Sequence, residues 1–183
     1  IIAEESNLSE TELLQNCIFI LNAGHETTTN LIGNALWALC TYPMVRKTLI
    51  KNPAILNSAI DEFLRFLSPN QFGNRETAFE VSLSGKKIPK NTNLHLCIGA
   101  ANRDPLQFKD PEELIIDRTP NRHLAFAGGA HHCVGFSLAK MEARIAIGMF
   151  LRNFPNYNLI SKPRWSRRIR FRGLTHLHAR LER

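Results

Sequence analysis

A glycine-rich loop that ends in a cysteine is the segment best suited to chemistry. It reads FAGGAHHCVG over residues 126–135, and a helix is predicted to follow it. Glycines let a backbone lie against a flat ligand, and free amides at a helix start favour the thiolate form of Cys133. That thiolate could be a nucleophile, a redox thiol or a metal ligand. A buried structural cysteine is the alternative, whereas a Cys–His nucleophile or a zinc site lacks a fixed partner and a second thiol.

A second polar segment, AGHETTT at residues 23–29, falls in the middle of the longest predicted helix. Glycine and β-branched residues are poor helix formers, so their presence there indicates a site. Gly24 would let the helix open to a ligand or water. The alternative to a site is that Glu26 is solvated and that the Thr27 hydroxyl bonds back to a carbonyl of its own helix. A zinc-protease HExxH motif is excluded, because Thr29 stands where the second histidine belongs.

Glu62 and Arg65 are spaced i, i+3, which places both on one face of a predicted helix. Such pairs usually lie on the surface and contribute little. Apolar residues flank this pair on both sides, in the sequence EFLRFL at residues 62–67. We therefore predict a buried ion pair.

The elements that position these residues follow from apolar spacing and turn residues. Ser9 and Glu12 form a predicted capping box. Helices are predicted at about 10–42, 44–51, 55–67 and 134–150, the last with Leu138, Met141, Ile145 and Met149 on one face. Short strands and a hairpin are predicted between 77 and 98, an irregular loop over 102–125 and a strand over 168–181.

The composition describes a globular, intracellular type of chain. It has 183 residues, 44% of them hydrophobic, and a net charge of +7. All of the excess charge lies in the tail from Lys162 onward. The four cysteines form no CxxC pair, and neither a membrane span nor a signal peptide is predicted, so we expect a cytoplasmic protein.

Taken together and in this order, the three polar motifs resemble those of the cytochromes P450, the haem-thiolate monooxygenases, in their soluble bacterial form. FAGGAHHCVG resembles the haem loop, Glu62-x-x-Arg65 the ExxR helix and AGHETT the oxygen-binding helix. Three further segments of the sequence also resemble those of the soluble bacterial members: ANRDP (101–105), NRHLAF (121–126) and AKMEAR (139–144). The resemblance covers the chain from about Ser9 onward.

The resemblance implies a role for each candidate residue. Cys133 would be the axial ligand of the iron of haem b. Thr27 would orient dioxygen and its protons, with Glu26 as the acid partner, and Glu62 and Arg65 would be structural, tying their helix to the loop near Asn121. The remaining cofactor-binding residues would be His131 and Arg75 at the propionates, Phe126 beside the sulfur, Gly128 and Gly135 in the loop, and Ala23 and Gly24 over the iron.

The implied fold is mainly α with a minor β part, the C-terminal portion of the cytochrome P450 fold. Residues 1–183 are expected to be a partial haem-thiolate monooxygenase domain whose N-terminal half is absent, since the chain starts at Ile1 close to the oxygen-binding helix. Two departures from the family pattern are small. Ala127 replaces the usual Gly or Ser of the haem loop, and Asn91 stands in a turn where Gly is usual.

The implied activity is insertion of one atom of dioxygen into a small organic substrate, with electrons from a ferredoxin or flavodoxin. The alternative is a truncated, non-catalytic remnant with weak or no haem binding. The basic, aromatic tail at 164–172 also fits nucleic acid, but the resemblance places closing β-strands there, so we expect no nucleic-acid or membrane partner. Arg122, Lys140 and Arg144 are candidates for docking an acidic electron donor.

Overall fold

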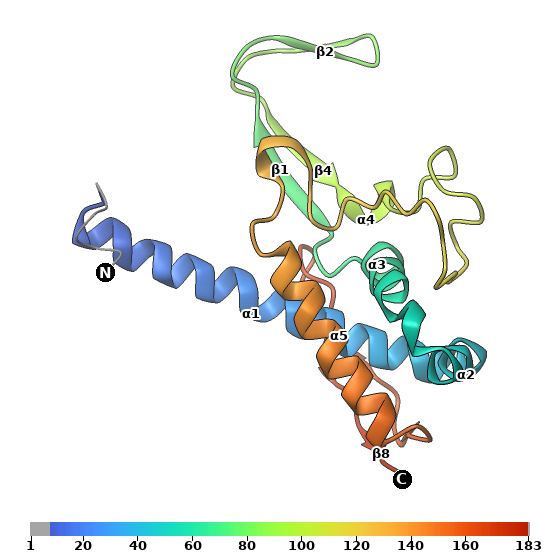
Figure 1. Cartoon of the computed structure of the whole chain (residues 1–183). Helices are drawn as coiled ribbons and strands as arrows, with labels where there is room; N and C mark the ends of the chain where they lie inside the picture. The colour runs from blue at the N-terminus through green and yellow to red at the C-terminus, as the bar shows by residue number, and fades with distance from the viewer. Residues whose placement is uncertain (1–7, 183) are drawn as a thin grey trace.

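The fold is organised around one long helix. The computed structural model describes residues 8–182. Helix α1 (Glu10–Thr41) packs against α5 (Phe136–Asn153) and α3 (Leu56–Leu67), and in Figure 1 it runs as a rod that α5 crosses. The other helical elements are short: α2 (Pro43–Lys51), α4 (Ile98–Ala101), and the 3₁₀ turns η1 (Pro53–Ile55) and η2 (Gly129–His131).

Helix α1 begins with the predicted capping box. The Glu12 amide donates to Ser9 Oγ, 3.3 Å away, and the Ser9 amide donates to Glu12 Oε2 at 2.8 Å. The helix is continuous over its 32 residues, so it does not open at Gly24. Its second half is buried in the core through Leu31, Ala35, Ala38 and Leu39, whereas most of the large apolar residues of its first half are exposed.

Helix α5 differs from its prediction in two ways. It begins at Phe136, two residues later than Val134, because Cys133 to Gly135 form a turn ahead of it. Its buried side consists of Ala143, Ile147 and Leu151, which pack with α1 and α3. The four residues predicted to share a face are all about half exposed: Leu138, Met141, Ile145 and Met149.

Within residues 8–182, the β part consists of four separate two-stranded antiparallel sheets. β1 (Phe72–Glu76) pairs with β4 (Asn93–Cys97), and β2 (Val81–Leu83) pairs with β3 (Lys86–Ile88) in a hairpin that projects from the body in Figure 1. Asn91 adopts a left-handed φ of 61°, as its place in the turn requires. The remaining sheets pair β5 (Asn158–Leu159) with β8 (Ala179–Arg180), and β6 (Arg164–Trp165) with β7 (Leu174–His176).

The prediction of one strand over 168–181 is wrong in extent. Only the short strands β7 and β8 form within it. Residues 166–173 instead make a loop that the bond from the Ser166 amide to the Gly173 carbonyl closes at 2.9 Å. Inside that loop Arg168 and Arg170 stack on the ring of Phe171, 5.1 and 5.3 Å from its centroid, an arrangement that regular strand alternation would not give.

The predicted fold class, mainly α with a minor β part, is confirmed. The loop over 102–125 contains turns and bends but no helix or strand, as expected. Across residues 8–182, none of the helices combines the length and the apolar character that crossing a bilayer demands.

Candidate functional site

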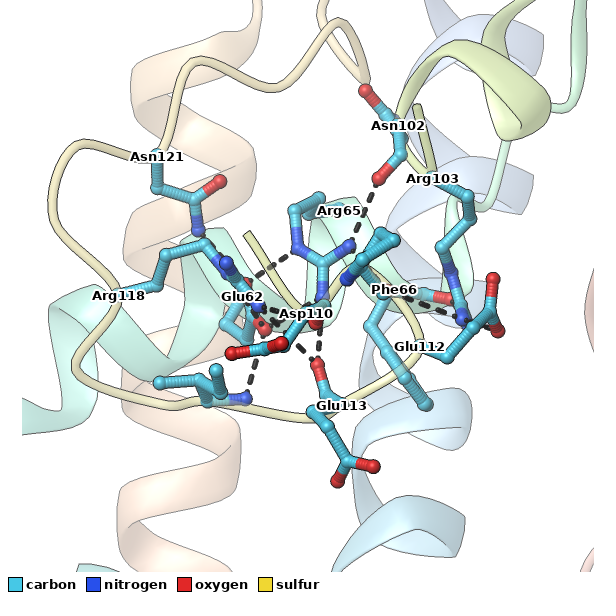
Figure 2. Close-up of polar contacts among 12 residues, drawn as sticks. Glu62, Arg65, Phe66, Asn102, Arg103, Asp110, Glu112, Glu113, Arg118 and Asn121 are labelled. Carbon is cyan, nitrogen blue, oxygen red and sulfur yellow. Dashed lines mark hydrogen bonds and ion pairs between the residues drawn. The ribbon is translucent and has the colours of Figure 1, made fainter. Parts of the chain in front are cut away.

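The Glu62–Arg65 pair lies at the centre of a buried polar network (Figure 2). Both side chains are fully buried. Arg65 Nε and Nη2 donate to the two oxygens of Glu62, each at 2.8 Å, in the bidentate geometry that gives the strongest pairs. The remaining guanidinium donors reach the backbone carbonyls of Asn102, Pro111 and Glu113, each at 2.9 Å. One arginine thereby fixes the irregular loop to α3.

The same carboxylate has further donors that the sequence did not reveal. Arg118 Nε lies 3.1 Å from Glu62 Oε2, the Ile115 amide lies 2.9 Å from Oε1, and Asn121 Nδ2 lies 3.1 Å from Oε2. The contact to Asn121 is the tie between this helix and the loop ahead of the cysteine that the resemblance implies. Arg118 was missed because residues 102–125 have no periodicity from which to place a side chain.

Asn102 carries the network to the cysteine loop. It is fully buried, and Nδ2 of its side chain donates to Ser68 Oγ at 2.9 Å. Its side-chain oxygen accepts the Leu124 amide at 2.7 Å. Two residues farther on, Phe126 begins the cysteine loop, so the buried polar network holds the loop's entry.

The cysteine loop presents Cys133 to the surface. Its amide donates to the Phe126 carbonyl at 2.9 Å, which closes the loop on itself, and its side chain is exposed. A Cβ built on Gly135 would lie 3.9 Å from Cys133 Sγ, whereas one built on Gly128 would meet no atom within 4 Å. Ala127 holds a left-handed φ of 58°, a conformation that costs alanine more than glycine.

In the polar segment of α1, Thr27 and Gly24 have different surroundings. Thr27 Oγ1 donates to the Ala23 carbonyl at 2.8 Å, so its hydroxyl folds back on the helix. Its two lone pairs stay available to accept. Gly24 is exposed, with no atom within 4 Å of the position of a Cβ.

Glu26 is not simply solvated. Its Oε1 lies 2.5 Å from Nη1 of Arg168, which comes from the tail loop 142 residues away. The guanidinium balances the charge of the carboxylate and limits its rotamers. This pair could not be predicted from the sequence, because its two members belong to elements with no fixed spacing between them.

The two residues expected at the propionates sit on different elements. Arg75 lies on β1 and is half-buried, with Nη1 donating to the Asn74 carbonyl at 2.7 Å. His131 ends η2 within the cysteine loop and is exposed. Each side chain keeps N–H donors for a carboxylate. Within residues 8–182 the two side chains do not contact each other.

The donor set fits haem better than a bare metal ion. Within residues 8–182, no three side chains of the His, Cys, Asp or Glu type are grouped to share a metal. Haem carries its own in-plane nitrogen ligands and needs only an axial donor from the protein, a role that a single thiolate fills. The open space beside Gly128 and Gly129 leaves room for a flat ring.

The tail's aromatic residues are already occupied. Arg172 stacks on the ring of Trp165 at 4.6 Å, and Trp165 packs edge-on against Trp37 of α1 at 5.0 Å. Phe171 carries two further arginines. These rings therefore bind arginines of the same chain, which leaves them less able to stack on bases.

Comparison with known proteins gives one consistent result. A model of the cytochrome P450 family matches residues 2–158. The chain is 43% identical over 156 residues to Cytochrome P450 CYP107DY1 of Priestia megaterium, covering 85% of this chain and 38% of that protein.

Two solved structures show the same likeness in three dimensions. P450BioI, solved with a hexadec-9Z-enoic acid-ligated acyl carrier protein, matches with a TM-score of 0.93 and 39% identity over 96% of this chain and 46% of that one. CYP109E1 of Bacillus megaterium, solved with corticosterone, matches with a TM-score of 0.93 and 34% identity over 97% and 49%. The chain therefore spans less than half the length of these relatives.

Proposed function

The chain belongs to the cytochrome P450 family, and on that premise we propose that the protein is a haem-thiolate monooxygenase that inserts one atom of dioxygen into an organic substrate. The observation that supports this most is the exposed Cys133 at the end of a glycine loop that is anchored to the buried Glu62–Arg65 network. Haem b, once bound, supplies a redox-active iron that takes electrons one at a time and reacts with dioxygen.

In this proposal each part of the site has a separate task. Cys133 Sγ binds the iron, and Phe126 packs beside the sulfur and shields it from water. His131 and Arg75 donate to the haem carboxylates, a pairing that charge-assisted hydrogen bonds favour. Four small residues leave room for the haem ring, for dioxygen and for the substrate. They are Gly128, Gly135, Ala23 and Gly24.

Proton supply is assigned to the polar segment of α1. Thr27 Oγ1, already donating to the Ala23 carbonyl, would accept a hydrogen bond from water and orient it. The carboxylate of Glu26 would bring protons from solvent, and its contact with Arg168 would hold it in place between transfers.

Replacing Thr27 with alanine is expected to lower the product formed per dioxygen consumed by about tenfold or more, with hydrogen peroxide making up the difference, because the group that orients the proton-carrying water is lost. The assay uses haem-loaded protein, a ferredoxin with its reductase, and isotopically labelled dioxygen. Hexadec-9Z-enoic acid and corticosterone serve as probes, since they occur in the two similar structures.

Thr29→Ala is the matched control, because Thr29 makes the same bond, to the His25 carbonyl at 2.8 Å. Its product yield should stay near that of the unaltered protein. An equal loss in both variants would refute the special role of Thr27. Products without label, formed while dioxygen is consumed, would refute the monooxygenase itself.

The comparisons do not favour the alternative, a non-catalytic remnant. All three motifs are intact, and the similarity extends over nearly all of the chain. The substrate class stays a proposal drawn from the relatives: a fatty acyl chain, as in the P450BioI complex, or a steroid, as in that of CYP109E1.

We assign electron delivery to an acidic ferredoxin or flavodoxin that docks on Arg122 and Arg144, both exposed near the cysteine loop and α5. Lys140 is a poorer docking residue than its position indicates, because its ammonium group already binds Asp61 at 2.7 Å. We also propose that the protein acts in the cytoplasm, which cell fractionation would test.

Reversing both charges, with Arg122→Glu and Arg144→Glu, should weaken binding of an acidic ferredoxin by about tenfold or more and remove most of its salt dependence. The change is measured as the dissociation constant at several ionic strengths. Arg180→Glu, on β8, is the control. If the dissociation constant is unchanged by the charge reversal, this surface is not the docking site.

A further inference from the structure

The two ends of the cysteine loop converge on one carboxylate. Asp61, on α3, lies next to the buried Glu62 in the chain but takes no part in its network. Lys140 Nζ, from the second turn of α5, lies 2.7 and 2.8 Å from the two oxygens of Asp61. His123 Nε2, from the segment that enters the loop, lies 3.4 Å from Oδ1 of the same residue. Asp61 therefore joins the segments on either side of Cys133.

The partners of His123 define how its ring is held. Nδ1 accepts the Ala125 amide at 3.3 Å, so Nε2 carries the hydrogen that points to Asp61. The side chain is 8% exposed, and its ring packs 6.0 Å from that of Phe126. The Phe126 carbonyl in turn accepts the Cys133 amide at 2.9 Å. A continuous set of contacts thus leads from the Asp61 carboxylate to the backbone of the cysteine.

Asp61 is suited to hold both contacts because its carboxylate remains charged although it is partly buried. Burial raises the pKa of its carboxyl, but the hydrogen bonds from His123 and Lys140 outweigh that effect, and the net result is a pKa below the usual range of aspartate. Lys140 is about two-thirds buried at its side chain, so the pair is less screened than a surface pair. The contact is therefore present at neutral pH.

We propose that Asp61 is a positioning residue for the cysteine loop: its carboxylate ties His123 at the loop's entry to Lys140 at its exit and so fixes Cys133 Sγ. The significance for iron ligation rests on the proposed function, whereas the clamp itself is a property of the chain. Loss of the carboxylate should free the loop without disturbing the core of α1, α3 and α5.

Asp61→Asn tests the clamp without reference to haem. Hydrogen exchange, followed by mass spectrometry on haem-free protein, should be about tenfold faster in peptides covering 121–135, the loss expected when one charged hydrogen-bond acceptor is removed. Peptides from residues 31–39 of α1 should be unchanged. Glu142→Gln, an exposed carboxylate on α5, is the matched control and should exchange like the unaltered protein. Asp61→Asn that matches Glu142→Gln would overturn the clamp.

Two further variants keep the test decisive. Asp61→Glu retains the charge and should restore most of the protection, which a purely steric role would not predict. Lys140→Met removes only the exit contact and should raise exchange by a smaller factor, so it serves if Asp61→Asn does not fold. Unchanged exchange in Lys140→Met together with no rescue by Asp61→Glu would also overturn the clamp.

The holoprotein provides the second readout. With haem bound, Asp61→Asn should shift the midpoint potential of the iron and increase the fraction that loses the thiolate band after reduction, while Glu142→Gln should do neither. If the unaltered protein shows no thiolate-ligated haem, the proposed function fails and the exchange result still decides the clamp. If the haem is thiolate-ligated and its potential is the same in both variants, the clamp does not act on the sulfur.

Discussion

Arg65→Ala is expected to lower the free energy of unfolding by about 3–5 kcal/mol, the cost of removing one partner of a buried ion pair. Arg65 supplies the two shortest charge-assisted bonds to Glu62, which also accepts from Arg118, and the side chains of Glu62 and Arg65 have no exposed area. The substitution would also release the carbonyls of Asn102, Pro111 and Glu113. Because domains of this kind are stable by only about 5–15 kcal/mol, a loss of this size removes a large share of the total.

The change is measured by urea unfolding of the two proteins. Arg65→Lys should recover only part of the loss, since an ammonium group cannot reproduce the bidentate contact. Lys87→Ala is the control: Lys87 pairs with Glu80 at 3.6 Å, both highly exposed, and its loss should cost about 1 kcal/mol or less. A cost for Arg65→Ala no larger than that for Lys87→Ala would show that the network does not stabilise the fold.

What could be predicted from the sequence was local. The capping box at Ser9 set the start of α1, and the i, i+3 spacing within an apolar run indicated the ion pair that the structure places in the core. The left-handed turn at Asn91 was implied by the resemblance, because relatives usually have Gly there and Asn tolerates that conformation. In each case neighbours in the chain determine the outcome, so a pattern in the sequence suffices.

What could not be predicted depends on contacts between distant segments. Arg118 reaches Glu62 from 56 residues away, and Arg168 reaches Glu26 from 142 residues away. Neither arginine belongs to a periodic element, so nothing in its surroundings indicates where it points. The clamp at Asp61 likewise joins three segments that only the tertiary structure brings together.

The faces of α5 illustrate a different limit. Apolar spacing placed Leu138, Met141, Ile145 and Met149 on one side of the helix. In the structure that side is about half exposed, and the buried side consists of Ala143, Ile147 and Leu151. A helix with apolar residues on more than one side gives no signal for which side faces the core.

Cys133→Ser has the other large expected effect, complete loss of thiolate ligation. Cys133 is an exposed thiol in a loop whose backbone is fixed at Phe126 and, through Asn102, at the buried network. A serine oxygen lacks the soft, electron-rich character that favours iron in this position. Cys97→Ser is the matched control, because Cys97 is also exposed but ends β4, far along the chain from the loop.

The most direct measurement is the absorption spectrum of the haem-loaded protein after reduction and exposure to carbon monoxide. The unaltered protein and Cys97→Ser are predicted to show a Soret band strongly shifted to the red, the mark of a thiolate ligand, and Cys133→Ser is predicted to lack it. Persistence of that band in Cys133→Ser, or its absence from the unaltered protein with haem bound, would contradict the assignment of Cys133 as the iron ligand.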